Sequence, residues 1–404
     1  MIIRLAWRNI WRNKMRSMVI IASVTAGLFA GMSIMSLYKG MMKSRIRTVI
    51  DTETGHIQLH AKGFMGDQDP KRYVQEDGNK IIKLLKDKSI RAIAQRTITA
   101  GMVSTPNGSS GVSIIGISPE EEMRVSGLGK KMRQGKMTWP STTRGMLMGK
   151  KLAKKLKLTV GEKVVITMTD TADNLISAAF RIQGIYQSAN APLDEVNVYV
   201  SRKELQEMLG LENQVHEIAI VLHDDRLLDS TTQWLAMEFP TLAVEPWKAL
   251  SPETSLMAET VDTLSYIILV IILVALSFGI MNTMMMSILE RRHEIGMMMA
   301  LGMGRLPLLV LIMTETFFLT IAGIPIALVT GRTAIQYYAK KGMDLSGMGR
   351  EMMESFGFET MIYPDFPSDK IAFIIALVFA TALVSSVVPI LKSLSMNPVS
   401  ALQK

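Results

Sequence analysis

Apolar residues are concentrated in four long stretches of the chain, and ordinary mixtures of polar and apolar residues fill the intervals between them. Residues 17–38, 263–289 and 371–391 contain no charged side chain, and 306–331 contain a single one, Glu315. A helix that spans a membrane needs about 20 consecutive apolar residues. The pattern therefore predicts four membrane spans, at 17–38, 263–289, 306–331 and 370–391.

The interval between the first and second predicted spans, 39–260, has the pattern of a mixed α+β domain. Alternating positions predict strands at 55–61, 97–103, 112–117, 163–168, 178–185, 196–200 and 216–222. Helical spacing predicts helices at 80–94, 150–156, 202–209 and 227–239. Two lobes are expected, one from the ends of this interval and one from its middle, with 169–177 as a hairpin tip. The predicted fold is an α-helical membrane protein with four transmembrane helices plus a large α+β extracytoplasmic domain between the first and second.

The distribution of Lys and Arg predicts the orientation of the spans. Residues 1–16 carry five basic side chains and no acidic one, 290–305 carry three Arg, and 392–404 carry two Lys. Residues 332–369 instead carry six acidic side chains. Short cytoplasmic segments are enriched in Lys and Arg, so both termini and 290–305 are expected on the cytoplasmic side, and 39–260 and 332–369 on the other side.

The first sixteen residues have a pattern of their own. Arg4, Arg8, Arg12 and Arg16 recur every four residues beside Ile and Trp, which predicts an amphipathic helix lying in the membrane interface. A cleaved signal peptide is the alternative for 1–38, but the apolar run is longer than the roughly 7–15 residues of a signal core. We expect a retained anchor.

Composition narrows the chemistry. The net charge of +9 is explained by this topology, so no nucleic-acid partner is expected, and the absence of Cys excludes thiol chemistry. The string GMLMGKK at 145–151 has three residues between its glycines where a phosphate loop needs four, and no Ser or Thr follows the lysine. His56 and His60 lack an adjacent acidic ligand, so no metal site is predicted. We expect no enzyme active site and no bound cofactor in this chain.

Two features of the spans leave alternatives open. Many of the 33 methionines cluster at 281–286 and 297–299, either as an adaptable surface for a substrate or partner or simply as apolar helix formers, and we favour the latter. Glu315 is an intramembrane charge, which is costly and usually faces protein or water. Two interpretations of Glu315 stay open. It has a role in a bundle of moving helices, or it is a structural acid whose side chain reaches toward the membrane surface or pairs with a nearby polar group.

The segment ERRHEIGMMMALGMGR at 290–305 closely resembles the coupling helix of the MacB/FtsX-like permeases of ABC transporters. Met299 departs from the pattern, because a basic residue is common there. Three other segments agree with this family: LAWRNIWRNK at 5–14, GKKLAKKL with VGEKV at 149–164, and SMNPVSAL at 395–402. The string GHIQL at 55–59 is similar to the LolC/LolE branch, which releases lipoproteins.

The resemblance implies a permease subunit that pairs with a second permease, as a homodimer or a related heterodimer, and with two cytoplasmic ATPase subunits. ATP and Mg would be bound by those subunits. The implied coupling residues are Glu290, Arg291, Arg292, Glu294, Ile295, Gly296, Leu301 and Gly302. The location implied is a bacterial inner membrane, with several spans and both termini cytoplasmic.

The function favoured by this resemblance is ATP-driven release of lipoproteins from the inner membrane toward a periplasmic carrier. The hairpin tip would then hold the weaker carrier contacts, at Thr169, Asp170, Asp173 and Asn174. The alternatives are a MacB-like efflux permease for peptides or antibiotics and an FtsX-like transmitter that switches a cell-wall hydrolase. The FtsX-like outer domains are generally much smaller than 39–260.

The coupling assignment generates a prediction. Glu294→Lys, which reverses a charge on the docking helix, and Gly302→Pro, which distorts its exit turn, are each expected to uncouple ATP hydrolysis from transport without preventing membrane insertion. ATPase activity and transport are measured on the same membranes. Wild-type transport in either variant would contradict the assignment.

Overall fold

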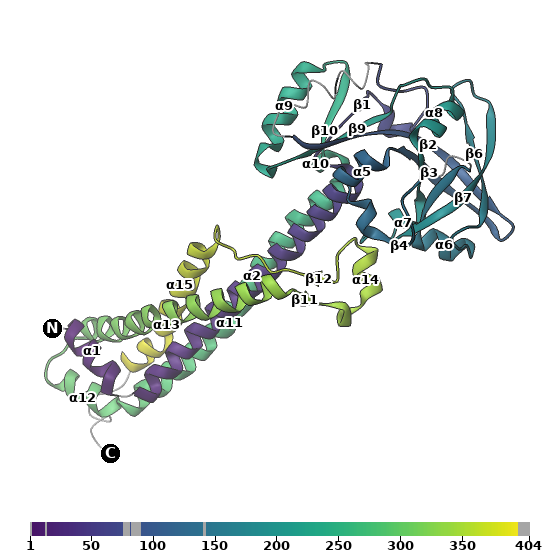
Figure 1. Cartoon of the computed structure of the whole chain (residues 1–404). Coiled ribbons are helices and arrows are strands. Elements are labelled where there is room, and N and C mark those ends of the chain that lie inside the picture. Colours follow the sequence, from purple (N-terminus) through teal and green to yellow (C-terminus); the bar gives the residue numbers. More distant parts are fainter. Residues whose placement is uncertain (1, 13, 76–80, 82–89, 140–142, 395–404) are drawn as a thin grey trace. The chain divides into compact units, whose positions relative to one another are not determined.

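The computed structural model describes residues 2–12, 14–75, 81, 90–139 and 143–394, and the chain forms two compact units (Figure 1). The first, termed the membrane unit, comprises Met1–Met42, Ala258–Asp344 and Met361–Lys404. The second, termed the extramembrane domain, comprises Lys43–Met257 and Leu345–Thr360.

Among the described residues, four helices are long and apolar enough to cross a membrane. They are α2 (Lys14–Val49), α11 (Pro252–Glu290), α13 (Arg305–Lys341) and α15 (Ile371–Leu394). The predicted fold, with four apolar helices of spanning length, is therefore confirmed. The helices are longer than the apolar stretches of the sequence. The 39 residues of α11 extend about 58 Å, whereas the hydrocarbon core of a membrane is about 30 Å thick.

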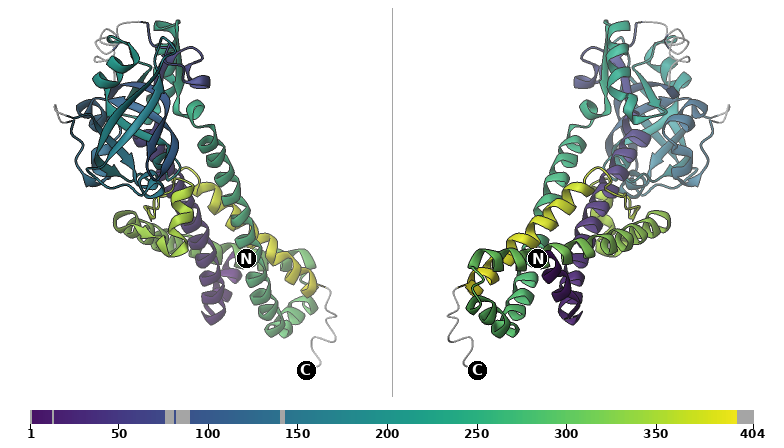
Figure 2. Two further views of the ribbon diagram at one scale, coloured as in Figure 1. Left: turned by 90° about the vertical axis from the view of Figure 1, so that its right-hand side faces the viewer. Right: turned by 90° about the vertical axis from the view of Figure 1, so that its left-hand side faces the viewer.

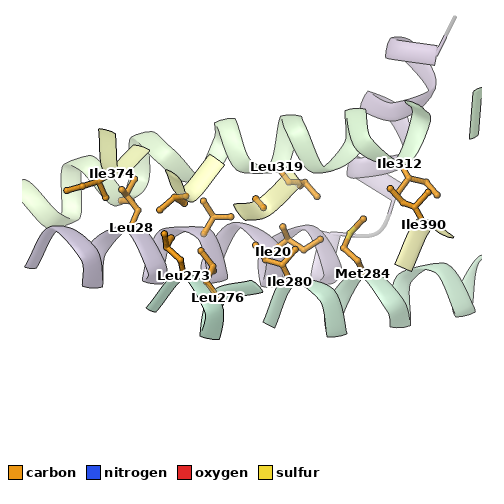
Figure 3. Packing of buried hydrophobic residues seen from close by; sticks show 14 of the residues in the cluster. Ile20, Leu28, Leu273, Leu276, Ile280, Met284, Ile312, Leu319, Ile374 and Ile390 are labelled. Carbon is orange, nitrogen blue, oxygen red and sulfur yellow. The ribbon is translucent and has the colours of Figure 1, made fainter. Parts of the chain in front are cut away.

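The four helices bury one continuous apolar cluster. Figure 3 shows Ile20 of α2 next to Ile280 of α11, and Leu28 of α2 next to Ile374 of α15. Figure 2 shows the same helices from two further sides. Because lipid is as apolar as leucine, close van der Waals packing holds such helices together rather than the hydrophobic effect.

Glycines allow close approaches between helices of this bundle. A Cβ on Gly27 of α2 would lie 2.8 Å from Leu276 Cδ2, and one on Gly31, a turn later, would lie 2.9 Å from Leu269 Cδ1. On α13, a Cβ on Gly323 would lie 3.0 Å from Val24 Cγ1. The glycines of α2 thus fix its distance from α11, and Gly323 fixes its distance from α13.

The short helix α1 (Ile2–Arg12) precedes α2 and packs along α13. Its Ala6 is buried, whereas the Trp7 and Trp11 side chains are exposed. The Trp7 ring meets Phe318 of α13 edge to face, with ring centroids 5.7 Å apart. The described helix ends at Arg12 and α2 begins at Lys14, so the amphipathic segment predicted over 1–16 is divided between two helices.

The segment after α13 includes a small two-stranded sheet in the membrane unit. β11 (Met343–Asp344) and β12 (Met361–Ile362) pair antiparallel. The residues between them belong to the extramembrane domain and include α14 (Arg350–Ser355).

Ten strands of the described extramembrane domain form one mixed sheet. They are β1 (Ile57–Ala61), β2 (Ile90–Thr105), β3 (Gly108–Ile117), β4 (Met132–Gly135), β5 (Gly145–Gly149), β6 (Lys163–Thr169), β7 (Leu175–Tyr186), β8 (Asn197–Ser201), β9 (Glu217–Leu222) and β10 (Leu242–Pro246). The order is β10-β1-β9-β2-β3-β8-β5-β7-β4, with β6 paired to β2 and β7. The helices are α3 (Phe64–Asp67), α5 (Pro119–Val125), α6 (Lys150–Leu156), α7 (Leu193–Val196), α8 (Arg202–Leu209), α9 (Leu228–Glu238) and α10 (Trp247–Leu250).

The long strand β2 divides this domain into the two expected lobes. Its first half, up to Arg96, pairs with β9, and its second half, from Thr97, pairs with β3. One apolar cluster gathers around β1, β9 and α9, built from both ends of the domain's sequence (Figure 1). A second cluster gathers around β5, β6, β7 and α6, from the middle of the sequence.

Most predicted strands and helices of this domain are present, with boundaries shifted by a few residues. The helix predicted over 80–94 is wrong for residues 90–94, because β2 begins at Ile90 and pairs with β9. Residues 82–89 lie outside the described part of the chain. The helical spacing over 90–94 is overridden by sheet pairing. The elements that were not predicted include the strands β4, β5 and β10 and the short helices α3, α5, α7 and α10. All five residues of β5 are buried, so its run of Met and Leu lacks the alternation of polar and apolar residues from which strands were predicted.

Arg96 lies where the two halves of β2 meet, in a buried ionic cluster. Its guanidinium donates to both carboxylate oxygens of Glu122, at 2.7 and 3.0 Å, and to Glu217 at 2.8 Å. It also donates to the backbone oxygen of Glu53, at 3.3 Å. The three side chains are at most 6% exposed. Burial raises the pKa of Glu217 above its ordinary value, although Arg96 opposes this effect.

Removal of Arg96 tests how far the domain depends on this cluster. Arg96→Met leaves two buried carboxylates without their cation, and we expect the free energy of unfolding to fall by about 3–5 kcal/mol. The matched control is Arg226→Met, since the side chain of Arg226 is 89% exposed, and we expect a change within about 0.5 kcal/mol. Thermal unfolding of the full chain in detergent measures both. Equal midpoints for the two variants would show that the cluster contributes little.

Candidate functional site

The candidate coupling segment is a short helix between two spans. After α11 ends at Glu290, α12 (Arg292–Ala300) follows, and α13 begins at Arg305. Gly302 has φ +92°, a conformation that favours glycine, and lies in the turn between α12 and α13. The predicted exit turn is therefore present at the predicted residue.

A network of polar side chains joins this segment to two other helices. Arg291 donates to both oxygens of Glu315 on α13, at 2.9 and 3.1 Å, and to Glu294 at 3.2 Å. Asn9 of α1 donates to Glu315 at 2.7 Å, and Arg12 of α1 donates to Glu294. Three helices therefore meet at two carboxylates, which we term the α1–α12–α13 network.

The network explains how a span tolerates Glu315. The Arg291 and Glu315 side chains are only 12% and 10% exposed, and a buried carboxylate without a partner would cost several kcal/mol. Of the alternatives left open by the sequence, the structure supports the locally paired acid. Partial burial opposes ionisation of Glu294, yet hydrogen bonds from Arg12 and Arg291 outweigh it and hold the pKa of Glu294 below its ordinary value.

The remaining residues of α12 divide into a buried and an exposed face. Ile295 and Gly296 are buried, and Ile295 joins the apolar core of the bundle. Met299 also packs against that core, so this position, where a basic residue is common, faces inward. In contrast, Met297 is 51% exposed and Leu301 is 88% exposed. These two apolar side chains and the half-buried Arg292 give α12 a surface suited to a partner.

Thus the structure brings together Arg291, Glu294 and Glu315 among the expected site residues. Glu290, Arg292, Leu301 and Gly302 lie on the same segment. Sequence reasoning missed Asn9 and Arg12, because the basic residues of 1–16 were interpreted as membrane anchors. A signal was present: a single acid in an apolar span requires a polar partner, and Asn9 lies among apolar residues on an amphipathic helix.

The four residues expected at the hairpin tip lie in or beside the β6–β7 turn. Asp170 Oδ1 accepts hydrogen bonds from the backbone of Asn174 and Ala172, each at 2.8 Å. The bond from Asn174 lowers the pKa of Asp170. Asp173 pairs with Lys71 at 2.6 Å, and Thr169 is opposite Leu175 in the strand register. The tip is a short, internally bonded turn held against the domain, and its carrier contact stays a prediction.

The two histidines considered for metal binding each face a separate carboxylate. His56 Nε2 lies 2.8 Å from Asp225, and His60 Nε2 lies 3.1 Å from Glu245. No cluster of three or more His, Asp or Glu residues with the arrangement of a metal site occurs among the residues that the structure describes.

Two protein families match this chain. The MacB-like periplasmic core domain matches residues 17–236, more than half of the chain, and the FtsX-like permease C-terminal domain matches residues 266–398. The second match contains α12, Gly302 and Glu315, and the first contains the hairpin tip.

Individual relatives are distant. The lipoprotein-releasing system transmembrane protein LolC of Neisseria meningitidis serogroup B is 22% identical over 332 residues, which cover 78% of this chain and 77% of that protein. An uncharacterized ABC transporter permease of Methanocaldococcus jannaschii is 26% identical over 160 residues, covering 38% of this chain and 40% of that one. The periplasmic region of MacB from Actinobacillus actinomycetemcomitans has a TM-score of 0.37 and 17% identity, covering 53% of this chain and 97% of that one.

The pairing of Arg291 with Glu315 is testable by a double-mutant cycle. Arg291→Gln leaves Glu315 charged and buried, so the thermal unfolding midpoint of the membrane unit should fall. Adding Glu315→Gln removes that charge and should recover part of the loss, with a coupling of about 0.5–3 kcal/mol.

The matched control for this cycle is Arg292→Gln, the same change at the next position, combined with the same Glu315→Gln. That pair should behave additively. If Arg291 and Glu315 also proved additive, their contact would have no energetic role.

Proposed function

This chain belongs to the MacB/FtsX-like family of ABC transporter permeases, and we propose that it releases lipoproteins from a bacterial inner membrane toward a periplasmic carrier. Members of this family are multi-pass membrane subunits that work with a cytoplasmic ATPase. The observation that carries the proposal is the similarity to LolC along 78% of the chain. The string GHIQL at 55–59, at the start of β1, adds to it.

The proposed mechanism starts at α12. Two ATPase subunits bind ATP and Mg, and their closure presses on the exposed face of α12, including Leu301 and Met297. The α1–α12–α13 network then moves as one body, because Arg291 and Glu294 connect α12 to Glu315 of α13 and Arg12 of α1. In this proposal both termini and α12 are cytoplasmic, in agreement with the Lys and Arg excess of these segments.

The movement reaches the extramembrane domain through the chain itself. The boundary between the two units falls inside α2, after Met42, and inside α11, after Met257. A lipid-anchored substrate would enter beside the first and second spans, where a second permease, identical or related, completes the complex. Exposed apolar side chains on α11, including Ile271, Val274 and Phe278, suit either lipid or that partner.

An efflux permease for peptides or antibiotics is the second candidate, and two observations favour it. The MacB-like periplasmic core domain accounts for residues 17–236, and the β6–β7 turn is a short hairpin rather than a protruding arm. Such a pump would act with a periplasmic adaptor instead of a lipoprotein carrier.

Depletion of the protein separates the two candidates. Lipoprotein release predicts that mature, lipid-modified lipoproteins accumulate in the inner-membrane fraction, measured by labelling with a radioactive fatty acid and separating the membranes. Complementation with the wild type should restore sorting, and complementation with Gly302→Pro should not. Normal sorting combined with increased sensitivity to exported compounds would instead support the efflux pump.

A further inference from the structure

A cleft in the extramembrane domain has no role in the function proposed above. It has a volume of about 520 Å³ and lies among β4, α6, the end of β7 and α14. This volume falls within the range of about 300–1,000 Å³ that is usual for small-molecule sites. Its floor is apolar, with Ala153, Leu158 and Ile185 buried.

The rim of the cleft is cationic. Arg133 of β4, Lys150 and Lys154 of α6, and Arg350 of α14 line it, and its described lining includes no acidic side chain. Lys150 and Lys154 are one helical turn apart and therefore share a face of α6. Arg350 is contributed by the segment between the third and fourth spans, so residues distant in sequence converge here.

Some cations of this domain pair with carboxylates, whereas Arg133, Lys150 and Lys154 of the rim have no such pair among the described residues. Lys155, the next residue on α6, pairs with Glu195 at 2.5 Å. Arg202 of α8 pairs with Glu121 at 2.7 Å. Within the described part of the chain, neither Arg133 nor Lys154 has such an ion pair, and Lys150 donates only to the amide oxygen of Gln187, at 3.2 Å.

We propose that this cleft binds a phosphate-bearing anionic ligand, either a soluble phosphate compound or the headgroup of an anionic lipid. Like charges that converge on one cleft repel one another, and a bound anion reduces that cost. Arginine matches phosphate with paired hydrogen bonds, and lysine adds a mobile positive charge. The cations converge from three elements on one cleft, rather than following a strand or helix in a row as an extended acidic peptide would require.

The test measures ligand binding to the full chain in nanodiscs of zwitterionic lipid. Pyrophosphate, titrated by calorimetry, should bind the wild type. Lys154→Gln should weaken binding about tenfold, as expected for the loss of a charge-assisted hydrogen bond. Lys151→Gln, the same change on the same helix but outside the cleft, should leave affinity within about twofold. A second pair of variants lies on the strands. Arg133→Gln changes a cleft residue of β4 and should weaken binding, whereas Arg181→Gln changes a residue of β7 outside the cleft and serves as its control.

The source of the phosphate is decided by a second titration. Dihexanoyl phosphatidylglycerol, below its micelle concentration, is compared with pyrophosphate and with dihexanoyl phosphatidylcholine. Tighter binding of phosphatidylglycerol than of pyrophosphate identifies a lipid headgroup, and the reverse order identifies a soluble ligand.

Three results would overturn the proposal. One is that no phosphate compound binds the wild type more tightly than Lys154→Gln. Another is that Lys151→Gln weakens binding as much as Lys154→Gln, which would indicate general attraction to a basic surface. The third is that a pentaglutamate peptide binds more tightly than every phosphate compound and depends on Lys154, which would assign the cleft to an acidic protein partner. Equal thermal unfolding midpoints of all variants show that each is folded.

Discussion

Glu315 is a charge in an otherwise apolar span, and its requirement for partners organises one end of the membrane unit. In a medium of low dielectric constant, an unpaired carboxylate is far less stable than a paired one. Arg291 satisfies it from the start of α12 and Asn9 satisfies it from α1. The candidate coupling segment and the N-terminal helix are therefore bonded to the same side chain.

The extramembrane domain has a comparable arrangement where α2 ends. Arg45 of α2 pairs with Glu53 at 3.0 Å, and Asn190 donates to the same carboxylate at 2.7 Å. Arg96 donates to the backbone oxygen of Glu53 and also holds Glu122 and Glu217. The helical turn Ile50–Thr54, which continues α2, is thus bonded to Asn190 and to Arg96, where β2 changes its pairing partner. A displacement of this turn must be shared by both residues.

The sequence predicted those parts of the structure that depend on local pattern. The four spans follow from uncharged length, and strands such as β3 and β6 follow from alternation. The contacts that define the candidate site depend on tertiary structure instead: 306 positions separate Asn9 from Glu315 in sequence. The helix expected over 80–94 failed for the same reason, since pairing with β9 decides the conformation from Ile90 onward. The exit turn at Gly302 was predictable, because glycine is a local signal for a positive φ.

The value of the Glu315 network lies in specificity rather than in stability. A buried ion pair commonly contributes no more to folding than well-packed apolar residues of the same volume, because desolvation offsets the attraction. An apolar replacement, however, would allow α12 to shift along α13 at little cost, since apolar contacts are not directional. The paired hydrogen bonds of Arg291 to Glu315 permit one register, and Arg12 to Glu294 fixes α1 in the same register. In the mechanism proposed above, a segment that transmits a push without sliding requires this property, which gives a reason for a polar network where α1 and α12 meet the span α13.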